Sequence, residues 1–255
     1  MGKGASFWEH LDALRGVILR VLAGVVLVSI VAFCFKDELF SLLLAPKEPD
    51  FWTYRMLDRL AAFFSSEPEA TKFSVSLINT QLAQQFLTHM QVSFYTGFVV
   101  VFPYMLYEVF RFVSPALYSQ EKFYVKSVVV SGYLMFMLGV LLCYYMIFPL
   151  TFRFLATYQV SELVENQIVL DSYIDTFVML SLMMGILFEL PVLSWLFAKL
   201  GFITSAFLAQ YRKHAFVGIL LVAAFITLTS DVFTLLIVAL PIYLLYEVSI
   251  LIIRP

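Results

Sequence analysis

The sequence predicts an all-α membrane protein with six transmembrane helices and with both termini on the cytoplasmic side. Of its 255 residues, 62% are hydrophobic and only 13% are charged, and the mean hydropathy is +0.92. A soluble domain of this size needs far fewer apolar residues for its core. Long apolar runs also recur along the chain, and about 20 residues suffice to cross a hydrocarbon layer roughly 30 Å thick. The net charge of −2 excludes a strongly basic nucleic-acid-binding protein.

The apolar runs place the expected spans at residues 17–35, 92–112, 126–148, 173–198, 214–229 and 232–252. Lysine and arginine gather in the segments that face the cytoplasm when the N-terminus is inside, which sets the orientation. The fifth and sixth spans are short, and the fifth implies local thinning or tilt of the bilayer. We therefore treat residues 1–255 as a single integral membrane domain.

Residues 37–90 form the longest hydrophilic connection, on the outer side in this orientation. Within it, residues 50–64 repeat apolar positions at helical spacing. This pattern predicts an amphipathic helical cap that lies on the membrane surface or over the mouth of the bundle.

The N-terminal segment is predicted to form an amphipathic helix before the first span. Ser6 and Glu9 have the spacing of a capping box, and the helix continues to about Arg20. Glu9, Asp12 and Arg15 lie away from its apolar stripe. Taken alone, this is an ordinary juxtamembrane helix whose charges are in water.

The first cytoplasmic connection, residues 111–122, presents an acid at the membrane surface. Pro115 interrupts the helix because it lacks a backbone N–H, and Glu121 follows beside Lys122. A carboxylate in this place suggests a docking site more than a catalytic one. The alternative is that Glu121 pairs with Lys122 or Lys126 in solvent, where such pairs contribute little.

Three acids fall inside predicted spans. Glu189, two residues before Pro191, is near the expected bilayer midplane, where an ionisable group usually faces a cavity or a partner. It either contacts such a partner or is a protonated side chain hydrogen-bonded within the bundle. Glu108 and Glu247 lie nearer the cytoplasmic ends, and for them structural and functional roles are equally open.

Nothing in the sequence predicts an enzyme, a metal site or a cofactor. His10, His89 and His214 are too far apart for metal-ligand spacing. A His-Glu-x-x-His motif, a glycine-rich phosphate loop and a nucleophile–base pair are all missing from the sequence.

Several motifs, in order, resemble those of the TatC family, the polytopic core of the twin-arginine protein translocase. The family's N-terminal His-Leu, acid and Leu-Arg pattern is similar to residues 10–15, and its Phe-x-x-Pro-Ala-Leu-Tyr-x-x-Glu loop motif to residues 112–121. Residues 188–191 and 239–247 match its fourth and last spans, and Asp231 falls at its tight turn between the fifth and sixth spans. The usual Glu before Leu-Arg is Ala13 here, with Asp12 beside it.

The resemblance implies a concave, glove-like bundle that receives paired-arginine signal peptides of folded cargo and exports the cargo across the bacterial cytoplasmic membrane with the proton-motive force. The implied partners are single-span TatA- and TatB-type subunits, membrane lipid and further copies of the chain. The peptide-binding residues expected from it are Glu121, Asp12, Glu9, Arg15, Phe112, Tyr118 and Pro115. The polar positions expected for partner contacts within the membrane are Glu189, Pro191, Asp231, Glu108 and Glu247. The alternative function is a secondary transporter that uses Glu189 as its coupling carboxylate.

Overall fold

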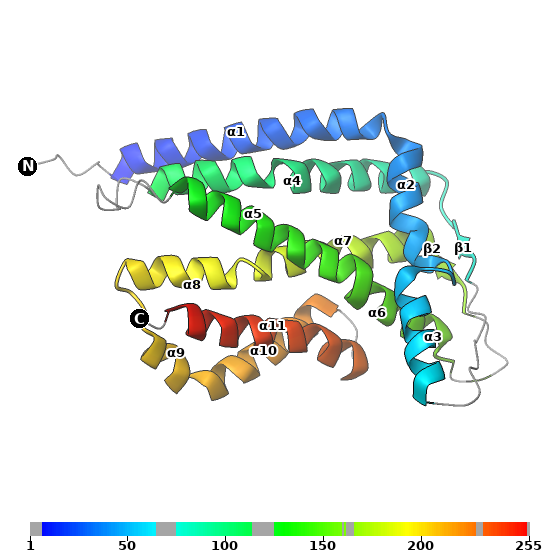
Figure 1. Cartoon of the computed structure of the whole chain (residues 1–255). Helices are drawn as coiled ribbons and strands as arrows, with labels where there is room; N and C mark the ends of the chain where they lie inside the picture. Colours follow the sequence, from blue (N-terminus) through cyan, green and yellow to red (C-terminus); the bar gives the residue numbers. More distant parts are fainter. Residues whose placement is uncertain are drawn as a thin grey trace, which may run out of the picture. The chain divides into compact units, whose positions relative to one another are not determined.

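The computed structural model describes residues 7–64, 75–113, 125–159, 161, 166–227 and 232–253. Helices dominate these segments, and the strands among them are two short pieces (Figure 1). The contacts divide the chain into two compact units. Unit 1 comprises residues 1–36 and 89–135, and unit 2 comprises residues 37–88 and 136–255.

Unit 1 is built on helix α1 (Phe7–Phe33) and most of helix α4 (Gln84–Val113), with the first part of helix α5 (Val125–Leu142). The amphipathic segment and the first span predicted from the sequence are therefore one continuous helix. α1 and α4 approach closely at Gly97, where a Cβ atom would come within 2.8 Å of the Val25 carbonyl oxygen. Small residues permit this kind of backbone approach between membrane helices.

Unit 2 holds the remaining elements. Its helices are α2 (Lys36–Leu44), α3 (Trp52–Phe64), α6 (Phe148–Thr157), α7 (Leu170–Leu187), α8 (Leu190–Lys199), α9 (Ser205–Gln210), α10 (Arg212–Thr227) and α11 (Val232–Ile253), with a short 3₁₀ turn at Ala45–Lys47. α11 packs against both α8 and α10. Strands β1 (Leu77–Ile78) and β2 (Ile168–Val169) pair in parallel, with Leu77 opposite Ile168.

Tyrosine hydroxyl groups link the segment that contains α2 and α3 to the other helices of unit 2 by hydrogen bonds. Tyr144 donates to the Leu42 carbonyl at 2.8 Å and Tyr173 to the Leu43 carbonyl at 2.9 Å. Tyr54 reaches the carbonyls of Pro46 at 2.9 Å and Pro149 at 3.1 Å. Burial raises the pKa of Tyr54 far above its usual range, so this hydroxyl stays protonated and keeps its donor.

The third span is longer than the sequence predicts. Pro149 should end it, because proline removes a hydrogen-bond donor, yet the helical run extends to Thr157. A π-helical turn, η4 (Cys143–Ile147), precedes Pro149, which therefore falls in the first turn of α6, where its missing N–H matters least. Thr53 of α3 donates its hydroxyl to the Tyr145 carbonyl in this widened turn.

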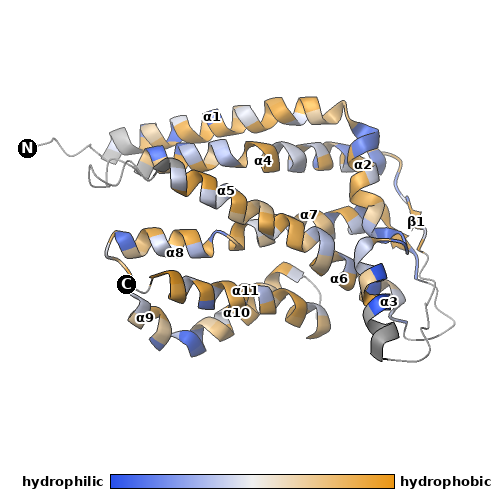
Figure 2. Cartoon of the chain, viewed as in Figure 1, coloured by the Kyte–Doolittle hydropathy of each residue, from blue (hydrophilic) through white to orange (hydrophobic). Residues whose placement is uncertain are grey.

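Five helical segments among the described residues are long and apolar enough to cross a membrane: Leu11–Phe33, Gln84–Phe112, Ser127–Thr157, Leu170–Lys199 and Val232–Ile253. Their apolar character is visible in Figure 2, most completely in α11. The expected span at residues 214–229 corresponds to α10, which has 16 residues and is shorter than these five. The expected span at 173–198 is two helices, α7 and α8, broken at Phe188 and Glu189.

Candidate functional site

Part of the predicted peptide-binding set lies within the described residues. Asp12 and Arg15 are exposed side chains on α1, and Phe112 is half-buried at the end of α4. The side chain of Glu9 lies outside the description, as do Glu121, Pro115, Tyr118 and the turn residue Asp231. Among the described residues, the exposed Asp12 carboxylate has no ion-pair or hydrogen-bond partner.

Glu108 has the most hydrogen bonds and ion pairs of the described acidic side chains in unit 1. Arg20 of α1 donates two hydrogen bonds to one of its carboxylate oxygens, at 2.6 and 3.1 Å. Tyr104, one turn earlier on α4, donates to the other oxygen at 3.2 Å, and the Arg111 guanidinium lies 3.8 Å from it. The Glu108 side chain is 3% exposed, so this carboxylate is buried and neutralised.

Sequence reasoning named Glu108 but missed Arg20. A signal was available, because an arginine and a glutamate inside apolar helices each need an opposite charge. Gly16, one turn before Arg20, leaves room for the guanidinium: a Cβ there would lie 3.3 Å from an Arg20 Nη atom.

Glu247 repeats the same arrangement in unit 2. Arg212 at the start of α10 donates to one carboxylate oxygen at 2.8 Å, and Tyr243, one turn earlier on α11, donates to the other at 3.1 Å. Residues 104–108 and 243–247 both read Tyr-x-x-Tyr-Glu. In both cases a tyrosine of the same helix and an arginine of a second helix donate hydrogen bonds to the carboxylate oxygens. This indicates that each glutamate holds two helices together.

Glu189 differs from these two acids because no described residue forms an ion pair with it. It lies in the break between α7 and α8, is 6% exposed, and one of its carboxyl oxygens is buried without a hydrogen-bond partner among the described residues. Pro191, also buried, follows in the first turn of α8. Burial of a carboxyl group without a hydrogen-bond partner costs free energy. The group can donate or accept a hydrogen bond when a partner binds.

A tight crossing of α5 and α7 supports the break at Glu189. A Cβ on Gly139 would lie 2.6 Å from the Met184 carbonyl oxygen and 2.9 Å from the Phe188 ring. A Cβ on Gly185 would lie 2.5 Å from the Phe136 ring. Both positions therefore require glycine, and the residues immediately before Glu189 are held against α5.

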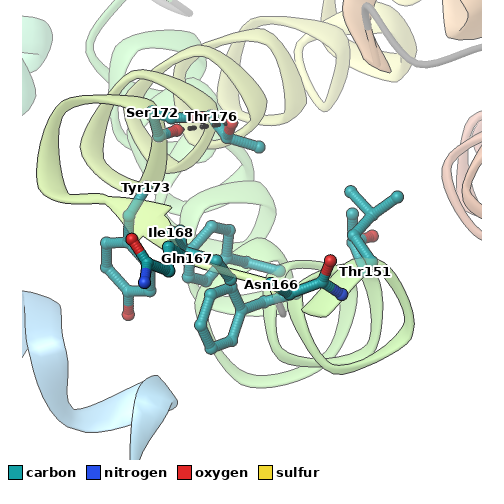
Figure 3. Close-up of a pocket in the computed structure, with 10 residues that line it drawn as sticks. Thr151, Asn166, Gln167, Ile168, Ser172, Tyr173 and Thr176 are labelled. Carbon is teal, nitrogen blue, oxygen red and sulfur yellow. Dashed lines mark hydrogen bonds between the residues drawn. The ribbon is translucent and has the colours of Figure 1, made fainter. Parts of the chain in front are cut away.

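A pocket of about 400 Å³ opens between α6, α7 and the segment that precedes β2 (Figure 3). Phe148, Phe152 and Tyr173 form its aromatic walls, and Asn166 and Gln167 add side-chain amides. Asn166 donates to the Ala156 and Tyr158 carbonyls and so caps the end of α6. None of the lining residues is charged at neutral pH, so the pocket offers no acid–base pair.

No metal centre is present in the described part of the chain, where His, Cys, Asp and Glu never gather in groups of three or more. The described site residues offer ionic and hydrogen-bonding recognition, through the exposed carboxylate of Asp12 on α1 and the buried carboxyl group of Glu189 at the α7–α8 break.

Comparison with known proteins identifies the family. The family model described as Sec-independent protein translocase protein (TatC) matches residues 9–241. The TatC protein of a Blattabacterium from Periplaneta americana is 32% identical over 248 residues, covering 96% of this chain and 93% of that protein. The TatC protein of Aquifex aeolicus is 32% identical over 243 residues, covering 95% and 92%.

Two crystal structures described as the twin arginine translocase receptor TatC share the fold, each at 31% identity. Their TM-scores are 0.74 and 0.77, covering 96% and 97% of this chain and 97% and 100% of theirs. TatC proteins are components of a protein translocase and are not enzymes. The chain belongs to the TatC family of Sec-independent protein translocases.

Proposed function

We propose that this protein is the signal-peptide receptor and core subunit of a twin-arginine translocase in the bacterial cytoplasmic membrane, where it exports folded proteins with the proton-motive force. The observation that carries the proposal is the likeness, over 96% of the chain, to a structure described as the twin arginine translocase receptor. This likeness favours protein export over the secondary-transporter alternative. In the proposed topology α10 is the short fifth of six spans, and both termini are cytoplasmic.

The proposed receptor site is Glu121 with Asp12 and Glu9, supported by Arg15, Phe112, Tyr118 and Pro115. A guanidinium group is a planar fork of donors that a carboxylate can accept in pairs, so acids suit a paired-arginine ligand. The bonding of the described acids supports this division of roles. Glu108 and Glu247 already form ion pairs with arginines of the chain itself, whereas Asp12 forms none among the described residues.

The proposed contact for single-span TatA- or TatB-type subunits is Glu189, with Pro191 shaping the helix break and Asp231 at the following tight turn. A polar group on a partner's span would give the unpaired Glu189 oxygen the hydrogen bond that lipid cannot offer. Such contacts are typically worth about 0.6 to 2 kcal/mol, which suits reversible recruitment. We also propose that several copies of the chain assemble with these subunits.

The experiment is export of a folded reporter from cells whose own TatC gene is deleted and which carry this chain with its native partner subunits. A reporter with a paired-arginine signal peptide should reach the outer side of the membrane, and a twin-lysine version should remain in the cytoplasm. Dissipation of the proton-motive force should stop export. Equal export of both reporters would overturn the proposal.

A further inference from the structure

One face of helix α3 has no role in the receptor or in partner recruitment as proposed above. Trp52, Arg55, Met56 and Arg59 occupy positions i, i+3, i+4 and i+7 of α3, which places them on one side of the helix. All four side chains are exposed, with 56% of Trp52 and 48% of Met56 accessible. We call these four residues the α3 stripe.

The opposite side of α3 packs against other elements of unit 2. Thr53 and Tyr54 are buried and donate hydrogen bonds to the carbonyls of Tyr145, Pro46 and Pro149. Phe51, immediately before the helix, stacks on the Tyr145 ring at 5.9 Å. The apolar side of α3 is therefore occupied by protein, and the α3 stripe faces away from it.

The α3 stripe lies where the membrane boundary is expected. Trp52 contacts the ring of Tyr145 edge-on at 6.0 Å, and Tyr145 is itself 42% exposed within the span Ser127–Thr157. Tyr145 is 18 residues after Ser127, about 27 Å along a helix, close to the roughly 30 Å of a hydrocarbon layer. Exposed Trp and Tyr rings gather at this boundary in membrane proteins.

The direction of α3 agrees with this position. In Figure 1, α3 runs crosswise to α8 and α11 of the same unit, so it lies along the membrane surface when those helices cross the bilayer. The α3 stripe then has two edges. Trp52, which contacts Tyr145, shares one edge with Met56, and Arg55 and Arg59 share the other.

The two arginines carry charge that the described residues do not neutralise. Arg55 donates from Nε to the Asp50 carbonyl oxygen at 2.6 Å, which holds its side chain in place without cancelling its charge. Neither Arg55 nor Arg59 has a carboxylate within ion-pair distance among the described residues. Two guanidinium groups one turn apart, beside an apolar edge at the boundary, match the phosphates of lipid head groups.

We propose that the α3 stripe is a binding site for anionic phospholipid. Arg55 and Arg59 bind head-group phosphates, and Trp52 and Met56 lie against the first carbons of the acyl chains. The site selects anionic over zwitterionic lipid because only the former has net negative charge, and the preference falls as salt screens the charges. Each arginine close to an anionic surface raises the affinity for that surface about fivefold. Loss of both arginines should therefore remove most of the selectivity for anionic lipid.

The test uses the full-length protein with Trp52 as its only tryptophan, made by Trp8→Phe and Trp195→Phe, since the chain has three tryptophans. It is reconstituted in mixed phosphatidylglycerol and phosphatidylcholine bilayers in which one lipid or the other carries bromine on its acyl chains. Bromine quenches tryptophan fluorescence at short range. Brominated phosphatidylglycerol should quench Trp52 several-fold more effectively than brominated phosphatidylcholine at the same mole fraction, and high salt should narrow the difference.

The double variant Arg55→Gln and Arg59→Gln should make the two lipids equal quenchers. Lys36→Gln is the matched control, because it removes an exposed positive charge at the start of α2, outside the α3 stripe, and should keep the preference. Equal quenching by both lipids in the parent protein would overturn the proposal, as would a preference that survives the double variant. A Trp52 that neither lipid quenches would place the stripe against protein or water and overturn it too.

Discussion

Glu108, Glu247 and Glu189 are three glutamates in apolar surroundings with different local bonding. The first two follow a tyrosine by four residues and accept an arginine from a second helix. Glu189 retains a buried oxygen without a partner among the described residues. A carboxylate that is already paired holds its two helices together, whereas a buried carboxyl group with a free oxygen is the better candidate for recognition.

At Glu121, replacement by Gln should strongly weaken binding of a paired-arginine signal peptide and leave membrane insertion intact. Gln keeps the shape of the side chain and removes the charge, and hydrogen bonds to charged groups are worth about 1.5–3 kcal/mol. The expected loss of affinity is therefore roughly ten- to hundredfold. Site-specific crosslinking of a labelled peptide to membranes with matched protein levels measures it. Normal crosslinking of the variant would show that Glu121 is a solvent-exposed loop residue with no part in peptide binding.

At Asp12, replacement by Asn should weaken peptide binding, and adding Ala13→Glu to that variant should restore it. Asp12 is exposed and unpaired among the described residues, but it is one residue away from the position of the family's acid, about 100° around the helix. We expect a smaller loss than for Glu121, because a displaced acid meets the ligand less directly. Unchanged affinity in Asp12→Asn would leave two options, that Glu9 binds the peptide or that no N-terminal acid does.

At the scale of the elements, the crossing of α5 and α7 should be intolerant of any side chain. Gly139→Ala places a Cβ 2.6 Å from the Met184 carbonyl oxygen, so backbone must move, and overpacking of this kind typically costs about 1–3 kcal/mol. Gly218→Ala is the matched control, because nothing lies within 4 Å of its Cβ position. Thermal unfolding of the purified proteins in detergent measures both. Equal transition temperatures for the two variants would show that the crossing is not closely packed.

The break between α7 and α8 should act in recruitment of single-span subunits and not in peptide binding. Glu189→Ala should impair crosslinking from positions around the break to a partner's span, by roughly three- to thirtyfold for a contact worth about 0.6 to 2 kcal/mol. Glu189→Gln should be largely tolerated, since it keeps a neutral donor and acceptor. Unchanged crosslinks in Glu189→Ala would make it a structural residue within the bundle.

Across the whole molecule, the pattern of long apolar runs in the sequence was enough to predict a helix in the described part of every expected span. It failed where the outcome depends on contacts between distant segments. The continuation of the third span beyond Pro149 depends on a π turn whose Tyr145 carbonyl accepts a hydroxyl from Thr53, 92 residues earlier. The short α10, by contrast, has 16 residues, the length expected for the short span at residues 214–229.

The candidate site was predictable to a similar extent. Intramembrane acids are rare enough to be noticed individually, so Glu108, Glu189 and Glu247 could be selected from the sequence. Which of them has a partner could not be predicted, because Arg20 and Arg212 lie 88 and 35 residues away from the acids that they bind. Pairing at these separations is decided by helix packing.

Recognition of paired arginines, as proposed for this chain, can be measured by equilibrium binding of a fluorescent signal peptide to the purified full-length protein. We predict saturable binding of the paired-arginine peptide. The twin-lysine peptide should bind at least tenfold more weakly, because an ammonium group cannot form the bidentate contact of a guanidinium. Equal affinity for the two peptides, or binding of neither, would show that the chain is not a receptor for paired arginines.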